Sequence, residues 1–116
     1  MSEYTPDLWQ IISITSPENE THYRVFACWY GGWAGSDSWK MNSGITSVQE
    51  NEHYYLFSGT SGSVYNCAKA ENCYRASGYG SGVLANYMAK LEEAGGKIEV
   101  LPQETDWLAF DWGCKE

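Results

Sequence analysis

Basic residues are scarce in this chain of 116 amino acids. Lys and Arg together number 7, against 15 Asp and Glu, so the formal net charge is −8. Proteins that bind nucleic acid or an anionic membrane surface rely on clustered Lys and Arg. The scarcity therefore argues against direct binding to either. The sequence also lacks an apolar run of about 18 residues and a signal peptide at its start, which predicts an intracellular protein without a membrane span.

Metal-ligating and catalytic patterns are also missing. The only histidines, His22 and His53, stand alone, and no C-x-x-C motif brings two cysteines together. No G-x-S-x-G motif lies between a strand and a helix. We therefore expect no metal, no cofactor and no enzymatic activity. In a reducing compartment we expect four thiols, most of them small buried apolar groups: Cys28, Cys67, Cys73 and Cys114.

Aromatic residues, in contrast, are abundant. Six Trp, nine Tyr and three Phe make up 16% of the chain, which is enough large apolar surface for a folded core. The length is typical of a single domain, which we assign to residues 1–116. The acidic excess is uneven: residues 1–20 and 99–116 each carry a charge of −4, and the middle of the chain sums to zero. If the terminal strands pair, both acidic segments share one edge.

Short segments with β-branched and aromatic residues, separated by Gly, Asn, Ser and Pro, predict strands. In residues 23–30 both alternating faces carry apolar groups, which favours a central strand; Arg24 falls on the same face as Phe26 and Cys28. Residues 106–112 fit a further strand or a short turn. The predicted strands cover residues 8–14, 23–30, 39–42, 45–48, 54–57, 63–67 and 97–101.

One segment has a helical period instead. Leu84, Tyr87, Met88 and Leu91 follow the i, i+3, i+4, i+7 pattern of an amphipathic helix. We expect this helix at about residues 82–94, with Ser81 as its N-cap and Gly95–Gly96 at its end. The predicted fold class is α+β: an antiparallel sheet of five to seven short strands with one helix packed on one face.

Several tryptophans lie next to acidic residues, a combination that suits a basic partner surface. Core packing could equally account for these aromatics, and the sequence leaves both interpretations open. The larger candidate set is acidic and C-terminal, and the smaller one surrounds a glycine-rich loop. The candidate partner-binding residues are Glu99, Glu104, Asp106, Trp107, Asp111 and Trp112 in the first set and Trp33, Asp37 and Trp39 in the second.

The stretches YRVFACWYGGW (23–33) and GSDSWKMNSGI (35–45), with YYLFSG (54–59) and GSVYNC (62–67), resemble small uncharacterised proteins encoded by tailed bacteriophages. The resemblance covers about the middle half of the chain. It implies a phage protein acting in the cytoplasm of a bacterial host. It brings no known activity and assigns no role to any residue.

Together these features predict a non-enzymatic, stoichiometric inhibitor that binds a basic surface of a host defence or nucleic-acid-handling protein, in the manner of an anti-CRISPR or anti-restriction protein. The sequence leaves open whether the protein forms a homodimer. One alternative is a structural or assembly module of the virion that self-associates through aromatic residues. A weaker alternative is a module that binds a small ligand.

Overall fold

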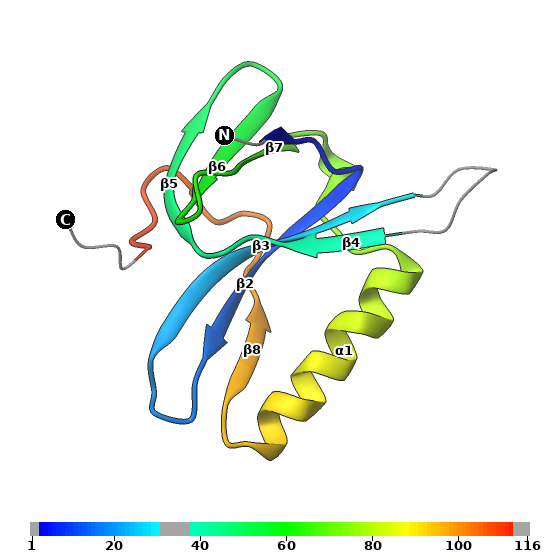
Figure 1. Ribbon diagram of the computed structural model, residues 1–116. Helices are drawn as coiled ribbons and strands as arrows, with labels where there is room; N and C mark the ends of the chain where they lie inside the picture. Colours follow the sequence, from blue (N-terminus) through cyan, green and yellow to red (C-terminus); the bar gives the residue numbers. More distant parts are fainter. Residues whose placement is uncertain (1–2, 31–37, 113–116) are drawn as a thin grey trace.

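The computed structural model describes residues 3–30 and 38–112. Within these ranges the chain forms two four-stranded sheets, one α-helix and a short 3-10 helix at Glu71–Cys73 (Figure 1). Sheet A has the order β1-β7-β6-β5, and sheet B has the order β4-β3-β2-β8. The elements of sheet A are β1 (Glu3–Tyr4), β7 (Val64–Ala68), β6 (Tyr54–Gly59) and β5 (Ile45–Glu50). Those of sheet B are β4 (Ser38–Met41), β3 (Thr21–Trp29), β2 (Leu8–Thr15) and β8 (Lys97–Val100), and the helix α1 spans Gly78–Glu93.

Sheet B is antiparallel and is built around the β2–β3 hairpin. The two strands pair over their full shared length, from Leu8↔Cys28 to Thr15↔Thr21. Strand β8 adds to the other edge of β2, with Thr15 opposite Lys97. The prediction of a central strand at residues 23–30 is confirmed, because β3 has a neighbour on each side.

Sheet A is an antiparallel meander of β5, β6 and β7, closed by the two-residue strand β1. Strand β1 runs parallel to β7, with Glu3 opposite Val64. The chain thus starts in sheet A, crosses to sheet B for β2 to β4, and returns to sheet A at β5. The expected pairing of the terminal segments holds for β2 and β8 only. Glu3 lies in sheet A, and Asp7 lies at the far end of β2, where its Oδ2 accepts a hydrogen bond from the Tyr30 N–H at 2.9 Å.

An aromatic core fills the space between the two sheets. Trp9 is its central residue: the ring contacts Phe57, Tyr74 and Trp107, with centroid separations of 5.6, 4.7 and 6.0 Å. Its Nε1–H donates to the Ala68 carbonyl at 2.8 Å, so the indole also satisfies its polar group. The buried members of this core are Trp9, Ile11, Val25, Ala27, Ile45, Phe57, Tyr65, Cys67 and Trp107.

Helix α1 packs on the opposite face of sheet B (Figure 1). It begins four residues earlier than predicted, and its N-cap is Ser77, whose Oγ accepts from the Gly80 N–H at 3.0 Å, rather than Ser81. The end was predicted correctly: Ala94 is the C-cap, and Gly95 follows with a φ of +96°. The second core, between helix and sheet, has the buried residues Leu8, Ile12, Phe26, Cys28 and Leu84.

The predicted α+β class, with a helix on one sheet face, is confirmed. In the described part of the chain the strands number eight rather than five to seven, and they divide into two sheets. Residues 107–109 form a short turn, and residues 106 and 110–112 on either side of it are irregular. Among the described residues, no helix is both long and apolar enough to cross a membrane.

Candidate functional site

The C-terminal tryptophans predicted to anchor a partner lie against the core. Trp107 is only 2% exposed, which corrects the expectation of a surface anchor. Its ring lies 6.1 Å from that of Phe57 and 6.2 Å from that of Trp112. Trp112 is half-buried beside it. The turns of residues 101–112 therefore fill and cover one side of the space between the sheets, instead of presenting both indoles to solvent.

The acidic residues of the same segment are exposed. Asp106 closes a turn, since its Oδ1 accepts from the Leu108 N–H at 3.2 Å. Glu99, on β8, forms an ion pair with Lys97 at 3.3 Å. Glu104 and Asp111 are also exposed. Asp106 directly precedes the buried Trp107 in the chain, and contact of these carboxylates with a basic partner stays a prediction.

Tyr74 fastens this acidic segment to sheet B. Its hydroxyl donates to the Leu101 carbonyl at 2.5 Å and accepts from the Ile11 N–H at 3.1 Å. Leu101 is the first residue after β8, so the phenol links β2 to the segment just beyond the end of the ladder. Burial raises the pKa of Tyr74 to about 12, and the nearby charge of Glu104 acts in the same direction.

The second predicted patch is divided. Trp33 and Asp37 lie outside the described residues. Trp39, on β4, faces α1 and packs against the second core. Since Trp107 belongs to the core on the other face of sheet B, the structure does not bring Trp39 and Trp107 to one surface.

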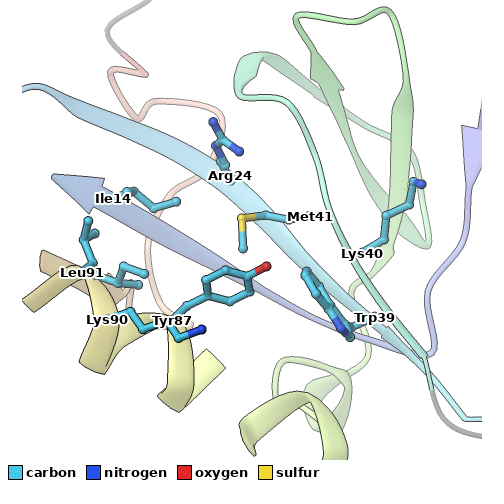
Figure 2. Close-up of a pocket in the computed structure, with 9 residues that line it drawn as sticks. Ile14, Arg24, Trp39, Lys40, Met41, Tyr87, Lys90 and Leu91 are labelled. Carbon is cyan, nitrogen blue, oxygen red and sulfur yellow. The ribbon is translucent and has the colours of Figure 1, made fainter. Parts of the chain in front are cut away.

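Trp39 instead lines a groove between α1 and sheet B, which we call the α1 groove (Figure 2). Its volume is about 780 Å³. All four strands of sheet B and the C-terminal half of α1 contribute to it. The lining residues are Ile14, Arg24, Trp39, Lys40, Met41, Tyr87, Lys90, Leu91 and Ile98.

The N-terminal end of α1 lies close to sheet B, and the groove begins beyond that contact. A Cβ atom on Gly80 would come within 2.5 Å of the Cys28 Sγ, so the first turn lies directly against β3. Leu84, one turn later, is buried, whereas Tyr87 is 43% exposed. Strand β4 also ends at Met41, where the Asn42 Oδ1 takes over as acceptor for the Val25 N–H at 2.9 Å. Helix and sheet therefore leave space beside the end of β4.

Two aromatic rings form one wall of the groove. Trp39 stacks on Phe26, with a centroid distance of 5.7 Å and an interplanar angle of 22°. Tyr87 approaches Trp39 edge-on at 5.6 Å and 73°. Figure 2 shows the Tyr87 ring reaching from the helix toward Met41 and Trp39. Since Trp39 is fixed by Phe26, it offers a preformed surface for a flat apolar group.

The charged side chains of the groove are cationic. Arg24 lies on the helix-facing side of β3, and its Nε is buried without a hydrogen-bond partner among the described residues. No ion pair in the described part of the chain involves Arg24 or Lys90. Lys40 lies at the rim and directs its Nζ over the Tyr4 ring at 5.2 Å, away from the groove. The groove thus combines an apolar interior with two unpaired cations in a protein of net charge −8.

The lining contains no carboxylate, imidazole, thiol or serine hydroxyl. These are the groups that most often act as general bases or nucleophiles. Among residues 3–30 and 38–112, no cluster of three or more His, Cys, Asp or Glu is arranged to hold a metal ion. The aromatic, aliphatic and cationic side chains that line the groove can bind an apolar or anionic ligand.

Comparisons of the chain with protein-family models, with curated proteins and with solved structures give no match in any of the three searches.

The groove was not predicted from the sequence, although the sequence contains one signal of it. Arg24 was placed on the same strand face as Phe26 and Cys28, and an arginine in line with core residues calls for an explanation. Tyr87 was assigned to the buried stripe of the helix, but it lies at the groove and is largely exposed. The distance between helix and sheet depends on Gly80 and Cys28, which are 52 residues apart, so no local pattern could reveal it.

Proposed function

We propose that this protein is a non-enzymatic binding protein and that the α1 groove is its ligand site. The observation that carries the proposal is the groove itself, with a volume of about 780 Å³ and the aromatic side chains of Trp39 and Tyr87 in its wall. Sites for small ligands usually occupy about 300–1,000 Å³ and are lined mainly by apolar and aromatic groups with a few polar ones. The composition and size of this groove agree with both properties.

A groove-filling variant tests the proposal. Met41 lies in the middle of the lining (Figure 2), so Met41→Trp places a large side chain in the space that a ligand would use. The probe is N-phenyl-1-naphthylamine, an uncharged aromatic dye whose fluorescence rises in apolar surroundings. We expect the native protein to bind the dye and M41W to bind it at least about tenfold more weakly, a loss of about 1.4 kcal/mol.

Leu108→Trp is the matched control. Leu108 is 48% exposed in the C-terminal turns and does not line the groove. The variant adds the same indole at a different place, so its affinity for the dye should equal that of the native protein. Thermal unfolding of both variants verifies that they are folded. Absence of dye binding, or equal binding by M41W and the native protein, contradicts the proposal.

A second function is favoured by the exposed carboxylates of the C-terminal segment. We propose that Glu99, Glu104, Asp106 and Asp111 allow the chain to bind a basic surface of a host defence or nucleic-acid-handling protein as a stoichiometric inhibitor. Exposed acidic groups steer association with basic partners, and the effect weakens as salt screens the charges. A buried Trp107 changes the hypothesis in one respect: it holds the acidic segment in place instead of contacting the partner.

Pull-down from host lysate at low and high salt tests this second function. The informative variant is the double substitution Asp106→Asn and Asp111→Asn, which removes two charges and keeps the oxygen that caps the turn at Leu108. The control is Glu92→Gln with Glu93→Gln, which removes the same charge from exposed positions near the end of α1. We expect a basic partner to be retained by the native protein and the control, and lost with D106N/D111N. Equal retention by all three would exclude this segment as the contact surface.

A further inference from the structure

The cationic side chains that line the α1 groove indicate the chemical class of its ligand more specifically than the volume of the groove does. An apolar groove that needed only to hold a neutral ligand would gain nothing from an arginine whose Nε is buried. Yet Arg24 occupies the helix-facing side of β3, opposite Ile12 across the β2–β3 pair. Buried polar groups are nearly always hydrogen-bonded, because an unpaired one loses its water without compensation. The described residues therefore do not satisfy the hydrogen-bonding capacity of the Arg24 guanidinium, which belongs to a residue that lines the groove.

The protein supplies no such acceptor from its described residues. No ion pair among them includes Arg24, and no Asp or Glu lines the groove. Lys90, on α1, adds a second cation to the lining, and Figure 2 shows Arg24 and Lys90 on opposite sides of it. Three of the seven basic residues of the chain line this one groove, although Lys40 directs its Nζ elsewhere. Both cations favour an anionic acceptor over a neutral one.

We infer that the ligand of the α1 groove is a small organic anion: a carboxylate, sulfonate or phosphate attached to one flat aromatic or apolar body. The inference rests on the proposed binding function of the groove and specifies the chemistry of the ligand. The anionic group accepts hydrogen bonds from the Arg24 guanidinium, and the Lys90 ammonium adds positive charge on the opposite side of the groove. The apolar body lies against Trp39 and Tyr87, with Met41 and Ile98 beneath it.

Charge favours a small molecule over an acidic peptide. Beyond Leu91 the helix continues into the exposed carboxylates of Glu92 and Glu93, and the turn between β2 and β3 carries Glu18 and Glu20, also exposed. An extended acidic chain leaving the groove in this direction would meet like charges. A compact anion of less than about 780 Å³ fits within the groove and avoids them.

Two dyes with the same ring system separate the charge requirement from simple apolar binding. 8-Anilino-1-naphthalenesulfonate and N-phenyl-1-naphthylamine both carry an anilino group on naphthalene, and only the first has an anionic group. We expect the native protein to bind the sulfonate at least about tenfold more tightly than the neutral dye. Arg24→Met keeps the apolar stem and removes the cation, so it should reduce this ratio to about one while leaving the affinity for the neutral dye within about twofold.

Arg75→Met is the matched control. Arg75 is exposed, does not line the groove and donates through its Nε to the Asn72 carbonyl at 3.0 Å. It changes the net charge by the same amount as R24M, so an effect confined to R24M is local to the groove. The ratio of the two affinities should be unchanged in R75M.

The outcomes distinguish this inference from the proposed function. If M41W leaves the affinity for both dyes unchanged, the groove is not a binding site and both claims fail. If M41W weakens both dyes but the native protein binds them equally, or R24M preserves the ratio, the ligand class is wrong and the binding function stands. Sedimentation supplies one further check: a native dimer that M41W converts to a monomer would assign the groove to a second copy of the chain and overturn the small-anion inference.

Discussion

The contact between Gly80 and Cys28 sets how closely α1 approaches sheet B, and substitution of this glycine tests it. A Cβ atom at position 80 would lie 2.5 Å from the Cys28 Sγ, 3.2 Å from the Ser77 Oγ and 3.4 Å from a ring carbon of Phe26. Carbon and sulfur atoms in contact are normally more than 3.5 Å apart, so Gly80→Ala requires the helix, the sheet or the buried Cys28 side chain to move by about 1 Å. Overpacking of this kind destabilises proteins by about 1–3 kcal/mol.

Helix propensity acts in the opposite direction. Alanine is more favourable than glycine inside a helix by about 1 kcal/mol, and by less in the first turn, where Gly80 lies. The steric effect therefore prevails, and we expect G80A to lower the free energy of unfolding by about 1–2 kcal/mol. Gly82 provides the comparison, because a Cβ there has no atom within 4 Å. Gly82→Ala gains the propensity without the clash, so it should raise the free energy of unfolding by about 0.5–1 kcal/mol.

Urea denaturation followed by circular dichroism measures both variants. The cysteine makes the test specific: Cys28→Ala removes the sulfur atom, and in that background G80A should lose most of its penalty. The double-mutant cycle should therefore give a coupling energy of about 1–2 kcal/mol between positions 28 and 80. A G80A protein as stable as G82A, or a coupling energy near zero, would refute the close approach of helix and sheet on which the α1 groove depends.

Three further predictions concern the core and the turns. Trp107→Ala should lower the free energy of unfolding, measured by urea denaturation, by about 3–5 kcal/mol, because it leaves a cavity between the sheets. A loss below about 1 kcal/mol would place the indole at the surface. Burial raises the pKa of both Tyr65 and Tyr74 to about 12, above the value near 10 of an unfolded chain, so these groups leave the free energy of unfolding unaffected below pH 10 and lower it as the pH rises toward 12. Tyr74→Phe should make that decrease shallower. An unchanged slope between pH 10 and 12 would contradict this expectation. Gly96→Ala should lower the free energy of unfolding by about 1–3 kcal/mol in the same urea assay, because its Cβ would lie 2.6 Å from the Thr15 carbonyl oxygen. An unchanged free energy of unfolding would show that the turn before β8 can move.

The positions of most strands could be predicted from the sequence, but their division into two sheets could not. Alternation along residues 23–30 identifies a strand that is apolar on both faces, and the structure covers one face with α1 and the other with sheet A. Alternation says nothing, however, about which strand lies beside which. The chain leaves sheet B between β4 and β5, within the three residues 42–44, and that segment is predicted equally well as an ordinary hairpin turn.

The start of the helix shows how a distant contact decides between two local signals. Ser77 and Ser81 are both suitable N-caps, and the intervening glycines favour the later start, because glycine is a poor helix former. The structure selects Ser77, since Gly80 can then lie against Cys28 with no side chain between them. The pairing of that glycine with a residue 52 positions earlier is not visible in the local sequence.

The candidate site was predicted least well, for the same reason. Trp107 stands among acidic residues, and local composition places such a tryptophan at the surface. Its burial follows from contacts with Trp9 and Phe57, which lie about 100 and 50 residues earlier in the chain. Trp39 was predicted to belong to a partner-binding patch with Trp33 and Asp37, and the structure places it in the lining of the α1 groove.

The pairing of strands also sets an order of events during folding. Within each sheet most partners are close in sequence: β2 with β3, β3 with β4, and β5 through β7. Such hairpins close quickly, because little chain entropy is lost. The exceptions are β1 with β7 and β2 with β8, which join residues 61 or more positions apart. We therefore expect the two sheets to pack together after these hairpins have formed. Until they do, the apolar face of β6 would be exposed to other chains, so dilute, cool conditions should favour refolding.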